Sequence, residues 1–378
     1  NAITAAKLAD NAIASDAQQN TVGGSNAGDS FSGTNATNNT LFGYNAGTAI
    51  TSTNGCTAFG DQALEACTSG SHNVAIGKQA LEATTVGQYN TAVGSGALDA
   101  NTTGDDNIAI GYGSLSANTT ADNNTAVGTS ALNANTTGTR NVGIGRSALQ
   151  ANTEGDYNTA LGFSALNANT TADNNTAAGY VALSANTTGT NNTAIGRRAL
   201  EDNTTASENT AVGQGSLQEN TTGANNTAVG SNALNVNTTG EDNTAVGVSA
   251  LQQNTGNDNT AVGKSALYAN TSGAKNTAVG ETALATNTTG ELNTAVGKDA
   301  LYANTTGNSN VAIGNTALIS NTEGSNNTAV GRYALDANTT ASHNTAVGYS
   351  ALSASVTAGN NACFGYQAGK DNTTGDSI

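Results

Sequence analysis

Apolar and polar positions along the chain repeat with a period of 17 residues. The unit reads N-T-A-V-G-x-x-A-L-x-A-N-T-T-G-x-x, and its first glycine, the motif glycine, recurs at this step from Gly43 to Gly247. One step of 16 residues leads to Gly263, because the N-T-T-G turn of that unit lacks one threonine, and the 17-residue step then runs to Gly365. An outlying copy covers residues 20–24. A tandem repeat of this kind indicates a repeat architecture rather than an ordinary globular domain.

Positions within the unit differ in how much they vary between copies. The residue before the motif glycine is always apolar, as in Phe42 and Ile76, and the fourth residue after it is leucine from Leu64 to Leu352. The residue directly after the glycine varies freely, as in Tyr44 and Lys78. We therefore expect the constant positions to face a core and the variable ones to face water. The predicted structural ladder includes Val93, Gly94, Leu98, Val127, Gly128, Leu132 and Asn135.

The unit predicts one turn of a β-solenoid. Seventeen residues are too few for the roughly 33 or more of helical repeats, and Thr-Ala-Val alternates in size as a strand does. Asn-Thr-Thr-Gly is typical of a turn. We expect a strand at T-A-V, a second short extended piece near A-L, and turns at the two glycines. Stacked coils of 17 residues then give an all-β parallel β-solenoid, in which valine and leucine form apolar ladders and the turn asparagines bond one another along the axis.

The repeat also divides the chain. Residues 1–19 are predicted to be an N-terminal linker, 20–38 an irregular leading repeat, 39–369 the tandem array, and 370–378 the start of a further segment. Glycine replaces the ladder leucine at Gly47 and Gly369, which we expect to mark the ends of the regular array. The chain begins at Asn1 without methionine, so it is expected to be a fragment of a longer protein.

Composition narrows the classes of function. The chain has 46 glycines and no proline, methionine or tryptophan, which is inconsistent with a large globular core. Its net charge of −16, without any cluster of lysine or arginine, argues against nucleic-acid binding. No apolar run approaches the ~20 residues of a membrane-spanning helix. Only 10% of residues are charged and the apolar pattern is regular, which favours an ordered chain over a disordered one.

Small side chains make a single stack of coils marginal. Alanine and glycine have little surface to bury, whereas ordering each residue of the backbone costs roughly 1–2 kcal/mol. Lateral association of several chains supplies the missing burial, so an oligomer is expected.

Catalytic and metal-binding patterns are absent, and we predict neither enzyme activity nor a cofactor. His72 and His343 share a variable, solvent-facing slot, and no C-x-x-C or Cys/His metal spacing occurs. Cys56 and Cys67 replace the two repeat asparagines of one unit. They are either small buried thiols or a disulfide across that coil. Cys363 takes a core alanine position and is expected to be buried.

Aromatic residues share two slots of the unit. Tyr268 and Tyr302 lie five residues after a motif glycine. Stacking on sugars is one interpretation of such residues, but their scattered occurrence among Asp, Lys and Ser favours ordinary surface positions. The slot directly after the glycine holds Tyr44, Tyr112, Phe163, Tyr180, Tyr349 and Tyr366.

Two groups of motifs resemble known families. The copies Asn73-Val74-Ala75-Ile76-Gly77 and Asn310-Val311-Ala312-Ile313-Gly314 are similar to the N-S-V-A-I-G repeat in the heads of YadA-like trimeric autotransporter adhesins. This resemblance implies a left-handed parallel β-roll and a homotrimer, although the unit of that family is shorter, near 14 residues. The segment from Asn1 to Ile13 and the 17-residue repeat resemble bacteriophage tail fibres.

These observations lead to three hypotheses of function. The first is the shaft of a phage tail fibre in the virion, a homotrimeric rod with other fibre or baseplate proteins as partners. Such a shaft presents a tip, expected after Ile378, that attaches to a glycan or protein of the host cell surface. The second is an adhesin on the bacterial or extracellular surface that grips its target with the repeat face. The third is an ice-binding solenoid with threonine arrays, which Val74 and Ile108 interrupt.

Overall fold

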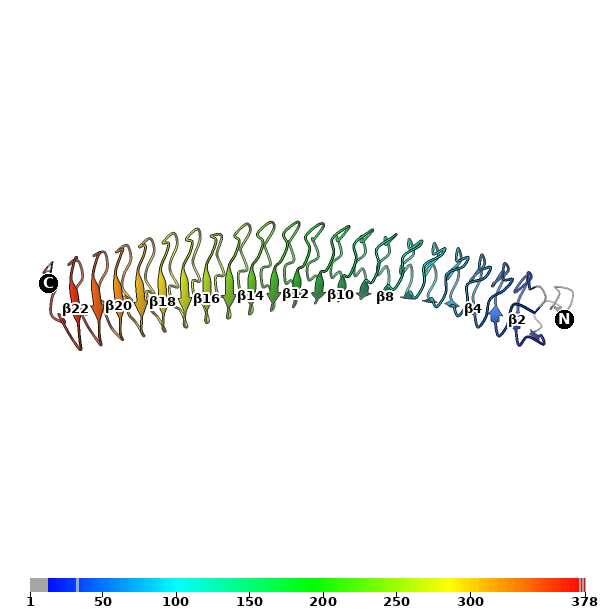
Figure 1. The fold of residues 1–378 in the computed structure, drawn as a ribbon, viewed down its shortest axis with the longest axis horizontal. Helices are drawn as coiled ribbons and strands as arrows, with labels where there is room; N and C mark the ends of the chain where they lie inside the picture. Colours follow the sequence, from blue (N-terminus) through cyan, green and yellow to red (C-terminus); the bar gives the residue numbers. More distant parts are fainter. Residues whose placement is uncertain (1–12, 32–33, 374, 376, 378) are drawn as a thin grey trace. The chain divides into compact units, whose positions relative to one another are not determined.

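A computed structural model describes residues 13–31, 34–373, 375 and 377. The chain is an all-β parallel β-solenoid of about 20 coils, and the described residues contain no helix. Both the solenoid and the 17-residue coil are as predicted. The coils belong to two compact units, Asn1–Thr190 and Asn191–Ile378, and in each unit Figure 1 shows one coil stacked on the next, with one strand per coil.

Each coil of the array contributes a strand of three residues. In the first unit the strands are β1 (Ala14–Ser15), β2 (Thr21–Gly23), β3 (Thr40–Phe42), β4 (Thr57–Phe59), β5 (Val74–Ile76), β6 (Thr91–Val93), β7 (Ile108–Ile110), β8 (Thr125–Val127), β9 (Val142–Ile144), β10 (Thr159–Leu161) and β11 (Thr176–Ala178). In the second unit they are β12 (Thr193–Ile195), β13 (Thr210–Val212), β14 (Thr227–Val229), β15 (Thr244–Val246), β16 (Thr260–Val262), β17 (Thr277–Val279), β18 (Thr294–Val296), β19 (Val311–Ile313), β20 (Thr328–Val330), β21 (Thr345–Val347) and β22 (Ala362–Phe364).

From β2 onward, neighbouring strands within a unit pair in parallel, with each residue beside its counterpart in the next coil. Thr210 pairs with Thr227, and Val212 with Val229. Each slot of the unit therefore becomes a column of equivalent side chains, spaced by about the 4.8 Å that separates strands. The leading repeat joins this arrangement, since β2 pairs in parallel with β3.

The N-terminal edge of the sheet is covered by β1, which runs antiparallel to β2. The Asp16 carboxylate between them accepts hydrogen bonds from the backbone N–H groups of Gln18 and Asn20. Pairing of this kind removes the free strand edge that would otherwise invite association. Residues 1–12 of the predicted linker lie outside the described residues, and the predicted domain boundaries remain predictions.

The predicted second extended piece near A-L is wrong. Residues 128–134 form consecutive turns instead, and Ser130 and Leu132 are left-handed, with φ of 56° and 51°. Residues with positive φ cannot continue the alternation of a strand. The coils are nevertheless bonded to each other here, because the Leu132 N–H donates to the Ala148 carbonyl at 2.9 Å.

The core lies between the strand and the A-L segment, and its composition corrects one prediction. Leucines of the ladder are fully buried, as expected for Leu98 and Leu132, but the inward residue of the strand is alanine. Val93 and Val127 point outward and are only partly buried. Leucine from the opposite wall occupies the space, since a Cβ on Gly143, which replaces an inward alanine, would lie 3.3 Å from Leu132 Cγ. A larger inward residue would overfill this narrow interior.

Glycine replaces the ladder leucine at three positions, and in the coil of Gly47 other side chains fill the interior. Gly28, Gly47 and Gly369 occupy this position with φ between 59° and 64°. In the coil of Gly47, a Cβ would lie 2.7 Å from Ile50 Cδ1 and 2.9 Å from Leu41 Cδ1. Leu41 stands where most coils have the inward alanine, and Ile50 where most have the turn asparagine. These two larger side chains therefore take the place of the leucine.

Candidate functional site

The turn asparagines form a buried ladder, which we call the turn-side ladder, as predicted for Asn135. The Asn135 Nδ2 group donates to Asn118 Oδ1 at 3.1 Å and to the Gly138 carbonyl of its own turn at 2.9 Å. Asn152 donates in turn to Asn135 Oδ1 at 2.8 Å. All of these side chains are fully buried. The Asn135 amide therefore has partners in its own coil and in the coils on either side, which satisfies its polar groups in the interior.

A second ladder, the strand-side ladder, consists of the asparagines that begin N-T-A-V-G. The Asn141 N–H donates to Asn124 Oδ1 at 2.9 Å, and Asn141 Nδ2 crosses the coil to the Gly155 carbonyl at 2.7 Å. Asn141 Oδ1 accepts the N–H of Asn158 at 2.9 Å. Sequence reasoning missed the burial of this column, although the near-constancy of asparagine before the strand could have indicated it.

Cys56 stands in the strand-side ladder and Cys67 in the turn-side ladder, and the structure has both as free thiols. This agrees with the interpretation as small buried residues, and the alternative disulfide is not formed. Both sulfurs donate to the Gly70 carbonyl, at 3.2 and 3.4 Å. A hydrogen bond between the two thiols lowers the pKa of Cys56 and raises that of Cys67, because the thiolate of one accepts from the other. Cys363 is buried in its alanine position, as predicted, and burial raises its pKa.

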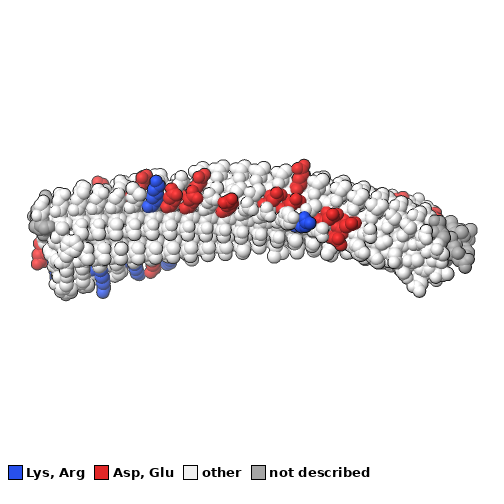
Figure 2. Space-filling view, in the orientation of Figure 1, with Lys and Arg blue, Asp and Glu red and all other residues white. Residues whose placement is uncertain are grey.

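The outward side of the strands forms an uncharged surface, which we call the sheet face. It consists of the threonine column and the apolar column that precedes the motif glycine, and no strand from β3 to β22 contains a charged residue. Ile195 is 43% exposed and Val229 37%, so a single chain leaves the apolar column only partly covered. On the face of the molecule shown in Figure 2, the charged side chains lie in scattered groups that are separated by broad uncharged areas.

Other candidate chemistry stays on the surface. His72 and His343 are exposed, as predicted, and His72 stacks on Tyr89 with ring centroids 5.2 Å apart. Within the described part of the chain, no group of three or more His, Cys, Asp or Glu side chains is placed to hold a metal ion. A search of the same residues finds no helix with the length and apolar character needed to cross a membrane.

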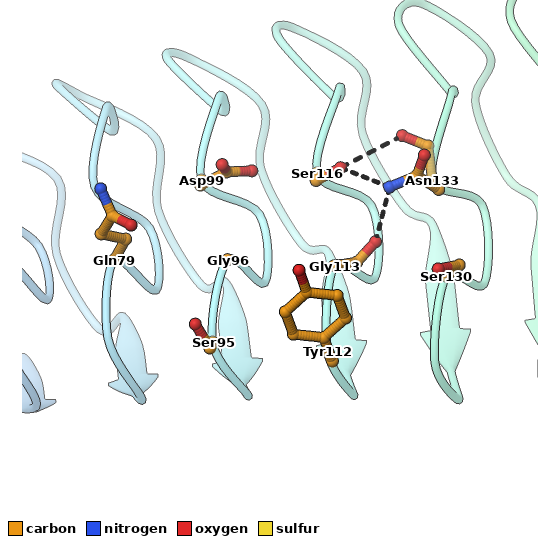
Figure 3. Close-up of a pocket in the computed structure, with 9 residues that line it drawn as sticks. All are labelled: Gln79, Ser95, Gly96, Asp99, Tyr112, Gly113, Ser116, Ser130 and Asn133. Atoms are coloured by element: carbon orange, nitrogen blue, oxygen red, sulfur yellow. Dashed lines mark hydrogen bonds between the residues drawn. The ribbon is translucent and has the colours of Figure 1, made fainter.

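A polar hollow of about 260 Å³ lies on the A-L side of the first unit. We call it the glycine recess, because Gly96 and Gly113 stand two residues after their motif glycines, where the flanking coils carry Gln79 and Ser130. Figure 3 shows Tyr112 beside this gap, with the polar side chains of the A-L segments across from it. These are Asp99, Ser116 and Asn133. The sequence analysis did not predict the recess, although the two successive glycines in one slot could have indicated it.

A second, more apolar recess of about 400 Å³ lies in the second unit, and we call it the tyrosine recess. Tyr268 and Tyr302 stand two coils apart in the slot after the ladder leucine, and Ala285 occupies the coil between them. The alanine is only 6% exposed between its larger neighbours. In both recesses a small residue in one column is flanked by larger ones, which is how a solenoid forms a hollow without altering its backbone.

Asp99 and Asp336 occupy the slot after the ladder leucine, one in each unit, and share an unusual environment. In each carboxylate, Oδ1 is buried without a hydrogen-bond partner. Burial raises the pKa of both residues above the ordinary value of 3.8, and nearby backbone N–H groups offset this only in part. A carboxylate held in this way costs free energy when it is ionised.

We expect Asp336→Asn to raise the melting temperature at pH 7, since the amide removes the cost of the buried charge. The folded-state pKa of Asp336 lies above its unfolded value, so the folded chain binds this proton more tightly. The cost is absent below pH 3.8, grows as the pH rises through the raised pKa, and is complete above it. Thermal melts from pH 3 to pH 7 should therefore show the advantage of the variant disappearing in acid. Equal melting temperatures at all pH values, or an equal gain from exposed Asp258→Asn, would contradict this.

Comparisons with known proteins give no family for the chain. No model of a protein family matches the sequence, and no curated protein matches it significantly.

Proposed function

We propose that this chain forms part of the shaft of a bacteriophage tail fibre, a homotrimeric rod that spaces and presents a receptor-binding tip in the virion. The resemblance of the N-terminal segment and of the 17-residue repeat to phage fibres supports the phage assignment. The near-identity of the coils supports a spacing role, because columns of equivalent residues stabilise the stack and do not form a catalytic site. The same shaft in a bacterial surface adhesin is the nearest alternative, supported by the N-V-A-I-G copies.

The sheet face carries the lateral association in this proposal. Its apolar column is kept in every coil although the single chain leaves residues such as Ile195 and Val229 about two-fifths exposed. Columns of this length, without charge, are the kind of exposed apolar surface that marks an interface. Three copies that pack these faces together remove the apolar columns from water and supply the burial that alanine-rich coils lack.

The first test is the absolute molar mass of the chain in solution by light scattering. We expect three times the chain mass of 37.1 kDa. The double variant Val229→Lys/Val246→Lys places two charges on the sheet face and should reduce the mass to that of one chain, because lysine in a packed apolar interface loses its hydration. Ser231→Lys is the matched control, since its slot already holds lysine at Lys264, and it should keep the trimer. A wild-type monomer, or a trimer in the double variant, would contradict the proposal.

An ice-binding solenoid is the second candidate, and one feature of the second unit favours it. The threonine column is unbroken over seven successive strands, β12 to β18, beside an apolar column in the same register. A flat array of threonine at strand spacing is a surface on which water can order. Thermal hysteresis of the purified chain tests this directly. A freezing point equal to the melting point would end the ice-binding alternative, and hysteresis in a monomer would favour it over the shaft.

A further inference from the structure

Two successive glycines open the glycine recess, and the fold does not require either of them. Their slot is left-handed in every coil, but other residues adopt it, including Gln79 and Ser130 with φ of 60° and 56°. A Cβ on Gly96 would meet only Asp99 Oδ2, at 3.9 Å, and one on Gly113 only Asn133 Nδ2, at 3.6 Å. Side chains would therefore fit in both coils. Their absence is what keeps the hollow open.

The polar groups of Asn133 and Ser116 at the recess are held in place by hydrogen bonds. Asn133 Nδ2 donates to the Gly113 carbonyl at 2.9 Å and to Ser116 Oγ at 2.6 Å, as the dashed lines in Figure 3 mark. These bonds fix the carboxamide and leave its oxygen to accept from a ligand. Asp99 Oδ1 is buried without a donor, and Asp99 Oδ2 lies toward the slot of Gly96, 3.9 Å from where a Cβ on that glycine would be. A ligand with hydroxyl groups can donate to Asn133 Oδ1 and to Asp99 Oδ2.

Tyr112 gives the recess an aromatic side. Its side chain is 68% exposed, and its ring stands across from the polar groups in Figure 3. No lysine or arginine lines the recess, and Asp99 is its single carboxylate. An anionic ligand is therefore disfavoured, and one carboxylate supplies too few oxygens for a Ca²⁺ site, which takes about 6–8. The fitting ligand is uncharged, rich in hydroxyl groups and apolar on one face.

We propose that the glycine recess binds one sugar ring of a neutral saccharide, with ring hydroxyls donating to Asp99 and Asn133 and the C–H face of the sugar packing on Tyr112. The volume of about 260 Å³ lies just below the ~300–1,000 Å³ typical of sites for drug-sized ligands, which suits a single ring. Burial raises the pKa of Asp99, as expected for a carboxylate that water hydrates poorly in the free protein. This inference does not depend on the fibre proposal, because the recess lies within one chain and away from its strands.

The test uses the full chain and the methyl glycosides of glucose, galactose, mannose and N-acetylglucosamine as probes. Saturation-transfer NMR should detect at least one of them, and a titration then gives its affinity. Gly96→Ser/Gly113→Ser fills the recess with the residue that the slot holds at Ser130, and we expect it to lower the affinity at least about tenfold. Asp99→Asn should lower the affinity about tenfold or more, and Tyr112→Ser roughly fivefold.

Two variants separate this site from other tyrosines. Tyr180 stands in the same slot as Tyr112 and is 52% exposed, but Val181 fills the position that Gly113 leaves empty, so Tyr180→Ser should not change the affinity. Tyr302→Ser alters the tyrosine recess only. Binding that survives the filled variant, or that is lost in Tyr302→Ser, would place the sugar elsewhere and overturn the proposal. Absence of binding by all four glycosides would overturn it as well.

Discussion

Gly128→Ala is expected to lower the free energy of unfolding of the first unit by about 3 kcal/mol or more. Gly128 has a φ of 133°, outside the small left-handed region open to residues with a Cβ. A Cβ there would lie 2.6 Å from the Gly145 carbonyl oxygen and 2.7 Å from its carbon. Both atoms are backbone of the next coil, so no side-chain rotation relieves the overlap. The coils would have to separate where their hydrogen bonds hold them together.

Denaturant unfolding followed by circular dichroism measures this loss. Gly96→Ala is the matched control, because Gly96 also has a positive φ, of 64°, but an added Cβ would meet no atom closer than 3.9 Å. We expect the control to cost about 1 kcal/mol, the ordinary penalty of alanine in the left-handed region. Equal effects of the two substitutions would mean that the contact between motif glycines does not set the spacing of the coils.

Asn141→Ala is expected to cost about 1–3 kcal/mol, because it leaves one buried backbone donor unsatisfied. The Asn158 N–H loses its acceptor, whereas the Gly155 carbonyl loses one donor and keeps Asn152 Nδ2 at 3.0 Å. Both lie in the interior, where water cannot replace the missing amide without opening the coil. Substitution of a single ladder residue thus affects the coil that contains it and the coil that follows.

Asn167→Ala serves as the comparison for this loss. Asn167 is only partly buried and donates to the Ser147 carbonyl at 3.0 Å, on the surface of the A-L segment. Its slot accepts alanine at Ala285, so we expect a cost of about 1 kcal/mol or less. The same denaturation experiment reads both variants. A cost for Asn141→Ala as small as that for Asn167→Ala would show that the buried amides contribute little to stability.

Periodicity predicted the solenoid, the leucine ladder and the turn-side asparagine ladder, since all three follow from stacking identical units. It could not decide which side of the strand faces inward. The alternation in Thr125-Ala126-Val127 indicates which residues share a side of the strand. Because cores usually contain large apolar residues, we predicted that Val127 faces inward, and this prediction was wrong. The deciding fact was the reach of Leu132 across a narrow coil, which depends on the path of the opposite wall.

That path was itself hard to predict, because Leu132 adopts a left-handed conformation that leucine rarely takes. The expectation of a second extended piece near A-L followed from the backbone conformations that leucine ordinarily adopts. The glycine recess was not predicted from the sequence, for a different reason. Variable slots were read one unit at a time as solvent-facing, whereas the hollow exists only when Gly96 and Gly113 are read down their column, beside Gln79 and Ser130.

The 16-residue coil shows how little the columns depend on any single turn. Asn254 donates to the Gly256 carbonyl two residues on, at 2.8 Å, and still donates to Asn237 Oδ1 and accepts from Asn270 Nδ2. Because every coil offers the same contacts above and below, loss or gain of one whole unit by recombination between repeated gene segments would rejoin two matching surfaces. The number of units in the gene therefore sets the length of the stack. Each recombination event would change this length by about 4.8 Å per coil and leave the contacts between the remaining coils unchanged.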